Sequence, residues 1–178
     1  MEKGKIRLLD AEALWTYALK VLGGRAYSSS EMREKLRRRA ERAADVEDVL
    51  ARLKEHRYLD DRRFAEGFAA ARLANEKHGP VRVLQDLRHH RIAPSLAERT
   101  VKEVYRDTDE RVLIEDWIRR KYRLAPRQGL FAKDKDLAAA YRRLLRAGFR
   151  SPEILKVLKL YAKNPELLDS FEPPPPEE

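Results

Sequence analysis

The segment Leu53-Lys54-Glu55-His56-Arg57-Tyr58 places an apolar residue five positions after a leucine. The same spacing recurs in Leu87-Arg88-His89-His90-Arg91-Ile92 and in Leu144-Leu145-Arg146-Ala147-Gly148-Phe149. It is typical of a Schellman turn, in which a helix ends on a left-handed residue and an apolar contact closes across the chain reversal. We therefore predict left-handed backbone at the fifth residue of each segment, which is natural for glycine and costs about 1 kcal/mol for each arginine.

The sequence around these segments has the periodicity of helices. Apolar residues recur three and four positions apart, and no stretch alternates as a half-buried strand would. Two Ser-x-x-Glu sequences, Ser28 to Glu31 and Ser95 to Glu98, fit capping boxes at helix starts. Pro80 and Pro152 fit the first position of a helix, where the missing N–H costs nothing.

The helices are organised as a repeat. Leu36, Leu87 and Leu144 align as equivalent positions that lie 51 and 57 residues apart, a period that suits three short helices. A unit of this size buries little apolar surface alone, so neighbouring units should stack and share cores. We predict an all-α protein of three tandem three-helix repeats in an elongated body. The expected parts are an N-terminal segment (residues 1–10), repeats 11–59, 60–108 and 109–163, and an acidic, Pro-rich, disordered tail (164–178), with an internal loop at 124–133.

Composition excludes several classes of function. Hydrophobic residues make up 43% and charged residues 39% of the 178, which suits thin cores under a densely charged surface. The chain has no cysteine, which excludes a disulfide framework, a thiolate metal site and a cysteine nucleophile. The N-terminus lacks the apolar core of a signal peptide and no stretch is long enough for a membrane span, so we expect a soluble, cytoplasmic protein.

The net charge of +9 is concentrated late in the chain. Residues 1–110 carry 24 basic and 20 acidic groups, residues 111–163 carry 15 and 5, and residues 164–178 carry none and 5. The net charges are therefore +4, +10 and −5. A segment as basic as residues 111–163 attracts polyanions, whether nucleic acid or an acidic protein groove.

Several motifs resemble the bacterial RecX regulatory proteins. They occur in order between about residues 11 and 161. They are Tyr27–Leu36, Tyr58–Ala65, Gly79–Val83 with Asp86-Leu87, and Gly148-Phe149 with Ile154. The string Tyr58-Leu59-Asp60-Asp61-Arg62-Arg63-Phe64-Ala65 is the most specific. The chain departs from the family pattern at Arg57 and Arg91, where glycine is usual, and at His78, where a basic residue is usual.

The resemblance implies a curved, three-repeat protein that lies in the groove of the RecA recombinase filament on single-stranded DNA. RecX-like proteins typically inhibit RecA, including its ATPase, strand-exchange and co-protease activities, in recombinational repair and the SOS response. On this basis we expect RecA filaments as the partner, single-stranded DNA contacted through its phosphates, no membrane, no cofactor, no metal and a monomeric chain.

Cationic side chains are the candidates for contact with the partner and with DNA. They are Arg33, Lys35, Arg37, Arg62, Arg63, Arg82, Arg119, Arg120, Lys121, Arg123, Arg142, Arg143 and Arg146. The candidates around Arg37 also have a simpler interpretation as a solvated, salt-bridged helix surface, and Arg142, Arg143 and Arg146 as cations that relieve a helix dipole. Trp117 and Tyr122 could stack on a base, but the core is the better interpretation for both.

Nothing in the sequence indicates catalysis. Asp60 and Asp61 form a carboxylate pair, but at a helix start an N-cap role is the better interpretation. The four histidines lack a second metal ligand at helical spacing, and no phosphate-binding glycine loop or nucleophile elbow is present. We therefore predict that the protein is not an enzyme.

A second hypothesis is an autonomous DNA-binding protein of the helix-turn-helix type. Short three-helix units with capped turns can present a recognition helix to the major groove. Such proteins usually dimerise to read two half-sites, and no dimerisation helix is apparent here. Binding that is salt-sensitive and independent of DNA sequence would favour the filament regulator, and selective binding of one duplex would favour the rival.

Overall fold

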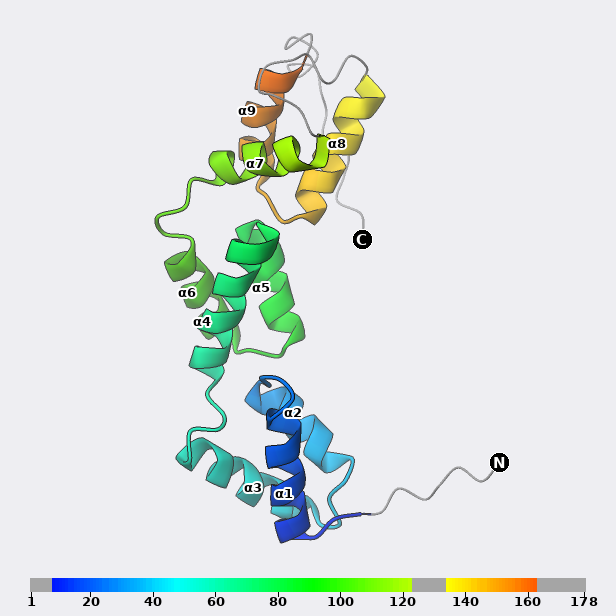
Figure 1. Cartoon of the computed structure of the whole chain (residues 1–178), viewed down its shortest axis with the longest axis vertical. Helices are drawn as coiled ribbons and strands as arrows, with labels where there is room; N and C mark the ends of the chain where they lie inside the picture. Colours follow the sequence, from blue (N-terminus) through cyan, green and yellow to red (C-terminus); the bar gives the residue numbers. More distant parts are fainter. Residues whose placement is uncertain (1–7, 123–133, 163–178) are drawn as a thin grey trace, which may run out of the picture. The chain divides into compact units, whose positions relative to one another are not determined.

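The computed structural model describes residues 8–122 and 134–162. Within these ranges the secondary structure is helical, apart from isolated bridges such as that between Leu9 and Ala40, which confirms the all-α prediction (Figure 1). The helices are α1 (Ala11–Leu22), α2 (Ser29–Arg37), α3 (Ala43–Glu55), α4 (Asp61–Ala71), the π-helical turn η1 (Arg72–Glu76), α5 (Pro80–His89), α6 (Pro94–Val104), α7 (Glu110–Tyr122), α8 (Asp134–Arg146) and α9 (Ser151–Tyr161). The predicted loop at 124–133 and tail at 164–178 lie outside the described residues.

The chain forms two compact units. The first unit holds the chain up to Phe68 together with Asp86–Thr100, and the second holds Ala69–Gln85 together with the chain from Val101 onward. The division passes through α4, α5 and α6. The repeat boundaries at residues 60 and 109 therefore remain a prediction.

In the first unit, α1, α2 and α3 pack around a small apolar core. Leu14, Met32, Leu36, Leu50 and Leu53 are its largest fully buried side chains. The backbone of Leu9 joins the turn after α2, because its N–H donates to Arg39 O at 2.7 Å and its carbonyl accepts from Glu41 N at 2.9 Å. These backbone bonds thus join the chain before α1 to the turn that follows α2.

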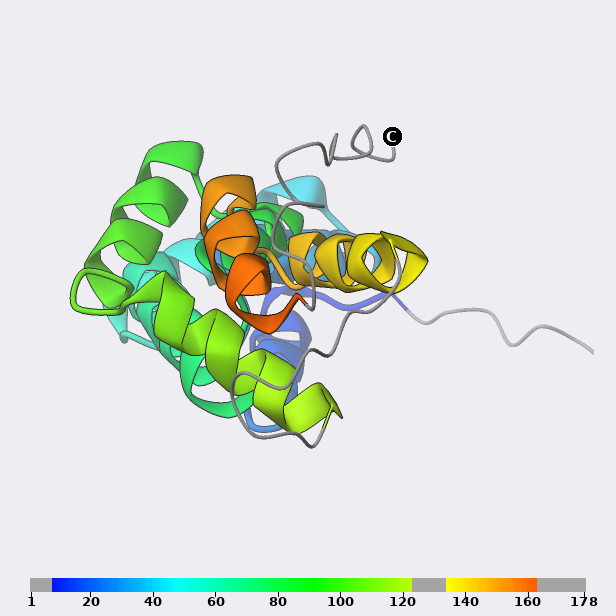
Figure 2. The ribbon, with the colours of Figure 1, turned by 90° about the horizontal axis from the view of Figure 1, so that it is seen from above.

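In the second unit, α9 packs against both α7 and α8 (Figure 2). Ile114, Leu144, Phe149, Ile154 and Leu158 form the centre of this core and have at most 1% of their surface exposed. The partly buried Trp117 and Tyr122 pack against the same cluster, so their prediction as core residues is confirmed.

All three predicted Schellman turns are present. Arg57 and Arg91 have φ of 58° and 57°, and Gly148 has φ of 90°. In the first turn the Tyr58 N–H donates to Leu53 O at 2.8 Å and the Arg57 N–H donates to Lys54 O at 2.9 Å. The other two turns repeat this pair of bonds, with their apolar residues Ile92 and Phe149 buried.

Tyr58 differs from the prediction, because the apolar residue of the first turn is 54% exposed. The next residue, Leu59, is 3% exposed, and its N–H also donates to Leu53 O at 3.2 Å. Leu59 is therefore the residue of this turn that enters the core, and Tyr58 lies on the surface.

The predicted helix starts are partly correct. Ser28 and Glu31 form a complete capping box on α2, and Asp60 Oδ1 accepts from Arg63 N at 3.0 Å as the N-cap of α4. The box predicted at Ser95 and Glu98 is wrong, because α6 begins at Pro94, which makes Ser95 the second residue of the helix rather than its N-cap. Pro80 begins α5 as expected, whereas Pro152 falls on the second position of α9.

A joint in the first unit connects the start of α2 to the end of α5. The Ser28 hydroxyl donates to the carbonyl of His90 at 2.6 Å, just before the left-handed Arg91. Beside it, the Ser29 N–H donates to Asp61 Oδ1 at 2.6 Å. Asp61 thus bonds to a neighbouring helix rather than capping its own, which corrects its predicted N-cap role.

A second joint, within the second unit, has the same plan. The Gly79 N–H donates to Ala147 O at 2.8 Å and the Val81 N–H donates to Gly148 O at 3.1 Å. The start of α5 therefore donates to the carbonyls of the Schellman turn that ends α8. In both joints the turn at the end of one helix accepts hydrogen bonds from the start of another, which satisfies polar groups that a helix end leaves unpaired.

The left-handed Arg57 allows a simple test of the first turn. We expect Arg57→Gly to raise the free energy of unfolding by about 0.5–1 kcal/mol, because glycine removes the left-handed strain, partly offset by the greater freedom of the unfolded chain. Thermal melting of the two proteins measures the difference. An unchanged or lower melting temperature would count against this cap.

Candidate partner and nucleic-acid interface

The candidate cations of α2 face carboxylates and a ring of their own unit. Arg33 binds Glu47 of α3 through two hydrogen bonds of 2.8 and 3.0 Å, and Arg37 lies 4.0 Å from the same carboxylate. The bond to Glu47 raises the pKa of Arg33 and, in return, lowers the pKa of Glu47. Lys35 lies over the Tyr27 ring, 5.6 Å from its centroid. These three cations therefore have structural partners.

The candidates on α4 are Arg62 and Arg63, and the candidate on α5 is Arg82. Arg62 pairs with Glu66 one turn along α4 at 2.8 Å, and this hydrogen bond raises its pKa. Arg63 is exposed. Arg82 is also exposed, and its backbone lies against Gly148, since a Cβ on that glycine would come within 2.3 Å of Arg82 N.

The end of α7 and the end of α8 bring several candidates together. Arg119, Arg120 and Lys121 lie in the last turn of α7, where cations are favoured by the helix dipole. Arg119 pairs with Asp116 at 2.9 Å, while Arg120 and Lys121 are exposed. Arg143 of α8 donates to the Tyr122 hydroxyl at 3.3 Å, which places it at this end of α7.

We call Arg120, Lys121 and Arg143 the α7–α8 cationic surface. The other candidates of α8 lie near it in sequence: Arg142 is half-buried and Arg146 is exposed in the last turn. Arg123 lies outside the described residues. The structure thus places part of the basic segment 111–163 at the ends of two helices that are connected through the Tyr122 hydroxyl.

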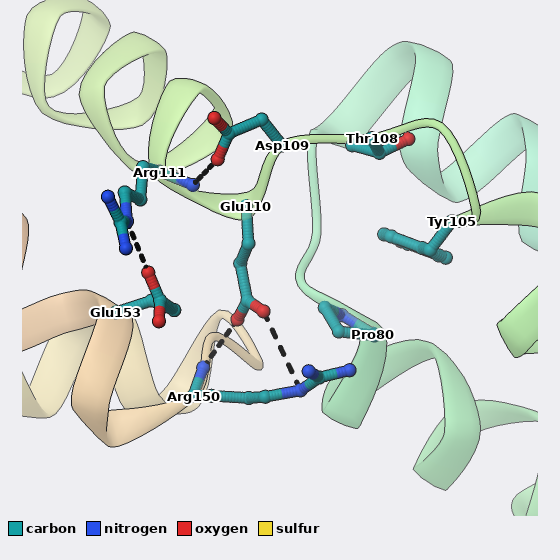
Figure 3. A pocket seen from close by; sticks show the side chains of 8 residues that line it. All are labelled: Pro80, Tyr105, Thr108, Asp109, Glu110, Arg111, Arg150 and Glu153. Carbon is teal, nitrogen blue, oxygen red and sulfur yellow. Dashed lines mark hydrogen bonds and ion pairs between the residues drawn. The ribbon is translucent and has the colours of Figure 1, made fainter.

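A polar pocket of about 490 Å³ opens beside the start of α7 and the start of α9 (Figure 3). The Glu110 carboxylate accepts from Arg150 N at 2.6 Å and lies 3.6 Å from Arg150 Nε (Figure 3). Arg111 binds Glu153 at 2.6 Å across the pocket. Lys156 and Arg111 together lower the pKa of Glu153.

The carboxylates of this pocket bind cations of neighbouring helices. Glu153 is held as a carboxylate by its cations and is therefore a poor proton donor or acceptor near neutral pH. The ion pairs connect residues about 40 positions apart, Glu110 with Arg150 and Arg111 with Glu153, and hold the start of α7 against the start of α9. Sequence reasoning missed these residues, because no local pattern marks ion pairs of such separation.

Two other kinds of site are absent from the described residues. No group of three histidine, aspartate or glutamate side chains is placed to hold a metal ion there. None of the helices in these ranges combines the length and the apolar character needed to cross a bilayer.

Glu31 lies in the first joint, at the centre of a set of hydrogen bonds. Its carboxylate accepts from Ser28 N at 3.1 Å, from Arg25 at 3.3 Å and lies 3.0 Å from His90 Nδ1. The rings of Phe64 and Phe68 pack edge-on against the His90 ring. Burial acts to raise the pKa of Glu31, but the hydrogen bonds outweigh it and leave the pKa below its ordinary value of 4.5.

We expect the first joint to weaken in acid. Because the pKa of Glu31 is lower in the folded state, its stabilisation is complete above pH 4.5, the ordinary value, and is lost as the pH falls below it. Glu31→Gln should therefore melt below the wild type at pH 6, and the two melting temperatures should converge as the pH falls below 4.5. Glu55→Gln, on an exposed face of α3, serves as the control. A gap that does not shrink in acid would contradict this role.

Fold and site together define an all-α repeat protein that presents cationic helix ends and holds its pocket carboxylates in ion pairs. Two family models match it: the first three-helix domain of RecX over residues 15–53 and the second three-helix domain of RecX over residues 60–101. Helices α7–α9 lie beyond both matches.

Curated relatives extend the similarity through much of the chain. A regulatory protein RecX of Deinococcus radiodurans is 34% identical over 163 residues, which is 88% of this chain and 74% of the relative. A regulatory protein RecX of Trichlorobacter lovleyi is 30% identical over 142 residues, which is 80% of this chain and 91% of the relative. The chain belongs to the RecX family of regulatory proteins, which confirms the resemblance seen in its motifs.

Solved structures show the same fold at low identity. A crystal structure of RecX from Lactobacillus salivarius matches with a TM-score of 0.66 at 16% identity, covering 85% of this chain and 96% of the other. A crystal structure of a regulatory protein RecX matches with a TM-score of 0.61 at 19% identity, covering 83% of this chain and 73% of the other. Both support a fold of tandem three-helix repeats.

Proposed function

We propose that this protein regulates the RecA recombinase by binding the RecA filament on single-stranded DNA. Its effect is to inhibit the ATPase, strand-exchange and co-protease activities of the filament. The observation that carries the proposal is membership of the RecX family through relatives that span most of the chain. The proposed mode of action is binding, without catalysis, a cofactor or a membrane, by a monomer in the cytoplasm.

The α7–α8 cationic surface supports the DNA part of the proposal. Arg120 and Lys121 are exposed and form no ion pair with the residues that the structure describes, unlike Arg33, which is bound to Glu47 at two points. Phosphate contacts fix the position of a protein on nucleic acid without reading its sequence. We therefore assign DNA a secondary role in affinity and the protein filament the role of specific partner.

The test is the DNA-dependent ATP hydrolysis of RecA from the same organism while this protein is titrated. We expect hydrolysis to fall as the protein approaches stoichiometry with RecA. The same titration without RecA controls for hydrolysis by the protein itself. Unchanged hydrolysis at a few-fold excess over RecA would contradict the proposed function.

The helix-turn-helix alternative predicts a different result in DNA binding alone. An autonomous reader of DNA retains one duplex sequence against an excess of others. A filament regulator that contacts phosphates binds DNA of any sequence, and salt weakens that binding steeply. Competition between random and selected duplexes at two salt concentrations separates the two hypotheses.

A further inference from the structure

Tyr58 belongs to the most specific motif of the sequence, residues 58–65, and its side chain does not enter the core. The other members have visible structural roles: Leu59 and Ala65 are buried, Asp60 caps α4, Asp61 binds Ser29 N, Arg62 pairs with Glu66, and Phe64 packs on His90. Arg63 and Tyr58 are exposed, Tyr58 by 54% of its surface. A tyrosine this exposed contributes little to the core and remains available for a contact.

Tyr58 is one of three neighbouring rings at the surface of the first unit. Its ring centroid lies 6.2 Å from Trp15 of α1 and 6.2 Å from His56, and the Trp15 and His56 centroids are 5.8 Å apart. The guanidinium of Arg52 lies 4.0 Å from the centroid of Trp15. Trp15, Arg52, His56 and Tyr58 are called the aromatic cluster below.

Rings that support one another in this way are held in place before any partner arrives. The edge contact between Trp15 and Tyr58 and the cation over the indole limit the freedom of three side chains. A contact made by such side chains loses little conformational entropy on binding. Tryptophan, tyrosine and arginine are also the residues that most often carry the affinity of protein–protein interfaces.

The charges around the aromatic cluster do not favour a phosphate chain. Arg52 pairs with Glu12 at 3.3 Å. Glu55 and Asp60 lie in the same stretch of sequence as the other basic residues. Residues 52–60 contain three basic and two acidic side chains. With Glu12, the partner of Arg52, the numbers of positive and negative charges are equal. A nucleic-acid surface carries an excess of positive charge, as the α7–α8 cationic surface does.

We propose that the aromatic cluster is a contact with protein rather than with DNA, made with the RecA subunits of the filament. This assignment rests on the proposed function and adds a division of labour to it. Tyr58 contacts the filament protein and is supported from behind by Trp15, which packs against the core of the first unit, while the α7–α8 cationic surface meets phosphates. The occupant is a protein surface because the cluster combines large rings with balanced charge.

Tyr58→Ala tests the assignment, with binding to preformed RecA filaments measured by co-sedimentation. We expect the dissociation constant to rise about 30-fold, as is typical when a central aromatic contact is truncated. Binding to single-stranded DNA in the absence of RecA should remain unchanged. Tyr58→Phe, which keeps the ring, should retain most of the affinity for filaments.

Leu160→Ala is the matched control, since Leu160 is 55% exposed on α9 and is not part of the aromatic cluster. It should bind filaments like the wild type. Thermal melting of both variants checks that the fold is intact. We expect it to be intact, because the side chains of Tyr58 and Leu160 are exposed.

Three outcomes would overturn the assignment. Equal loss of affinity for free single-stranded DNA would make the aromatic cluster a platform for bases. A wild type that self-associates through Tyr58, detected by sedimentation of the protein alone, would make the occupant a second copy of the chain. Filament binding that Tyr58→Ala leaves intact would remove the aromatic cluster from the interface. A wild type that does not bind filaments at all would instead refute the proposed function itself.

Discussion

Replacing Gly79 with alanine is expected to destabilise the second unit severely. A Cβ at this position would lie 2.2 Å from the carbonyl oxygen of Gly148 and 2.6 Å from Phe149 N, so backbone atoms would have to move. Such overpacking costs about 3 kcal/mol, which for a chain of this size lowers the melting temperature by about 6–12 °C. Circular dichroism during heating measures the change.

Gly67→Ala is the matched control for this experiment. A Cβ on Gly67, inside α4, meets nothing within 4 Å, so the same substitution should raise stability by about 1 kcal/mol through helix propensity. The opposite signs of the two effects separate steric exclusion at the joint from any general effect of replacing glycine. A Gly79→Ala protein that melts within a degree or two of the wild type would refute the close approach of the two backbones.

Reversing charge at the end of α7 is expected to weaken filament binding strongly at low salt, because it replaces attraction to phosphates with repulsion. The double variant Arg120→Glu/Lys121→Glu removes two cations from the α7–α8 cationic surface and adds two carboxylates. Affinity for RecA filaments on single-stranded DNA should fall by about 10- to 100-fold at low salt, and the difference should shrink as salt screens the charges. Fluorescence anisotropy of labelled filaments at several salt concentrations measures both effects.

The control for this variant is Arg99→Glu/Lys102→Glu on α6. Both side chains are exposed, and the change in net charge is the same, but neither residue belongs to the α7–α8 cationic surface. Equal losses in the two double variants would mean that net charge alone matters. Full affinity of the Arg120 and Lys121 variant would exclude the end of α7 from the interface.

The parts of the fold that depend on neighbours in sequence could be predicted. A leucine, a left-handed residue and an apolar residue at fixed spacing define a turn whose hydrogen bonds close within six residues, so the positive φ of Arg57 and Arg91 could be foreseen. The capping box at Ser28 and the cap at Asp60 are equally local. The wrong start of α6 arose because Pro94 and Ser95 both fit a helix start, and the position of proline prevailed.

Contacts over long separations could not be predicted. The hydrogen bonds from Gly79 to Ala147 and from Ser28 to His90 connect residues more than 60 positions apart, and each depends on how separate helices pack. The ion pairs of Arg33 and of Arg111 likewise depend on geometry between helices. The exposure of Tyr58 could not be predicted either, since spacing alone does not distinguish an aromatic residue in the core from one on the surface.

The second joint is made by backbone atoms, and this has a consequence for divergence. An N–H and a carbonyl exist at nearly every position, so the bonds from Gly79 to Ala147 and from Val81 to Gly148 place no demand on side-chain chemistry. Only the size of residues 79 and 148 is restricted, because a side chain on Gly79 or on Gly148 would collide with the backbone of the other segment. Sequences can therefore drift widely while the joint persists, in keeping with a shared fold at 16% identity.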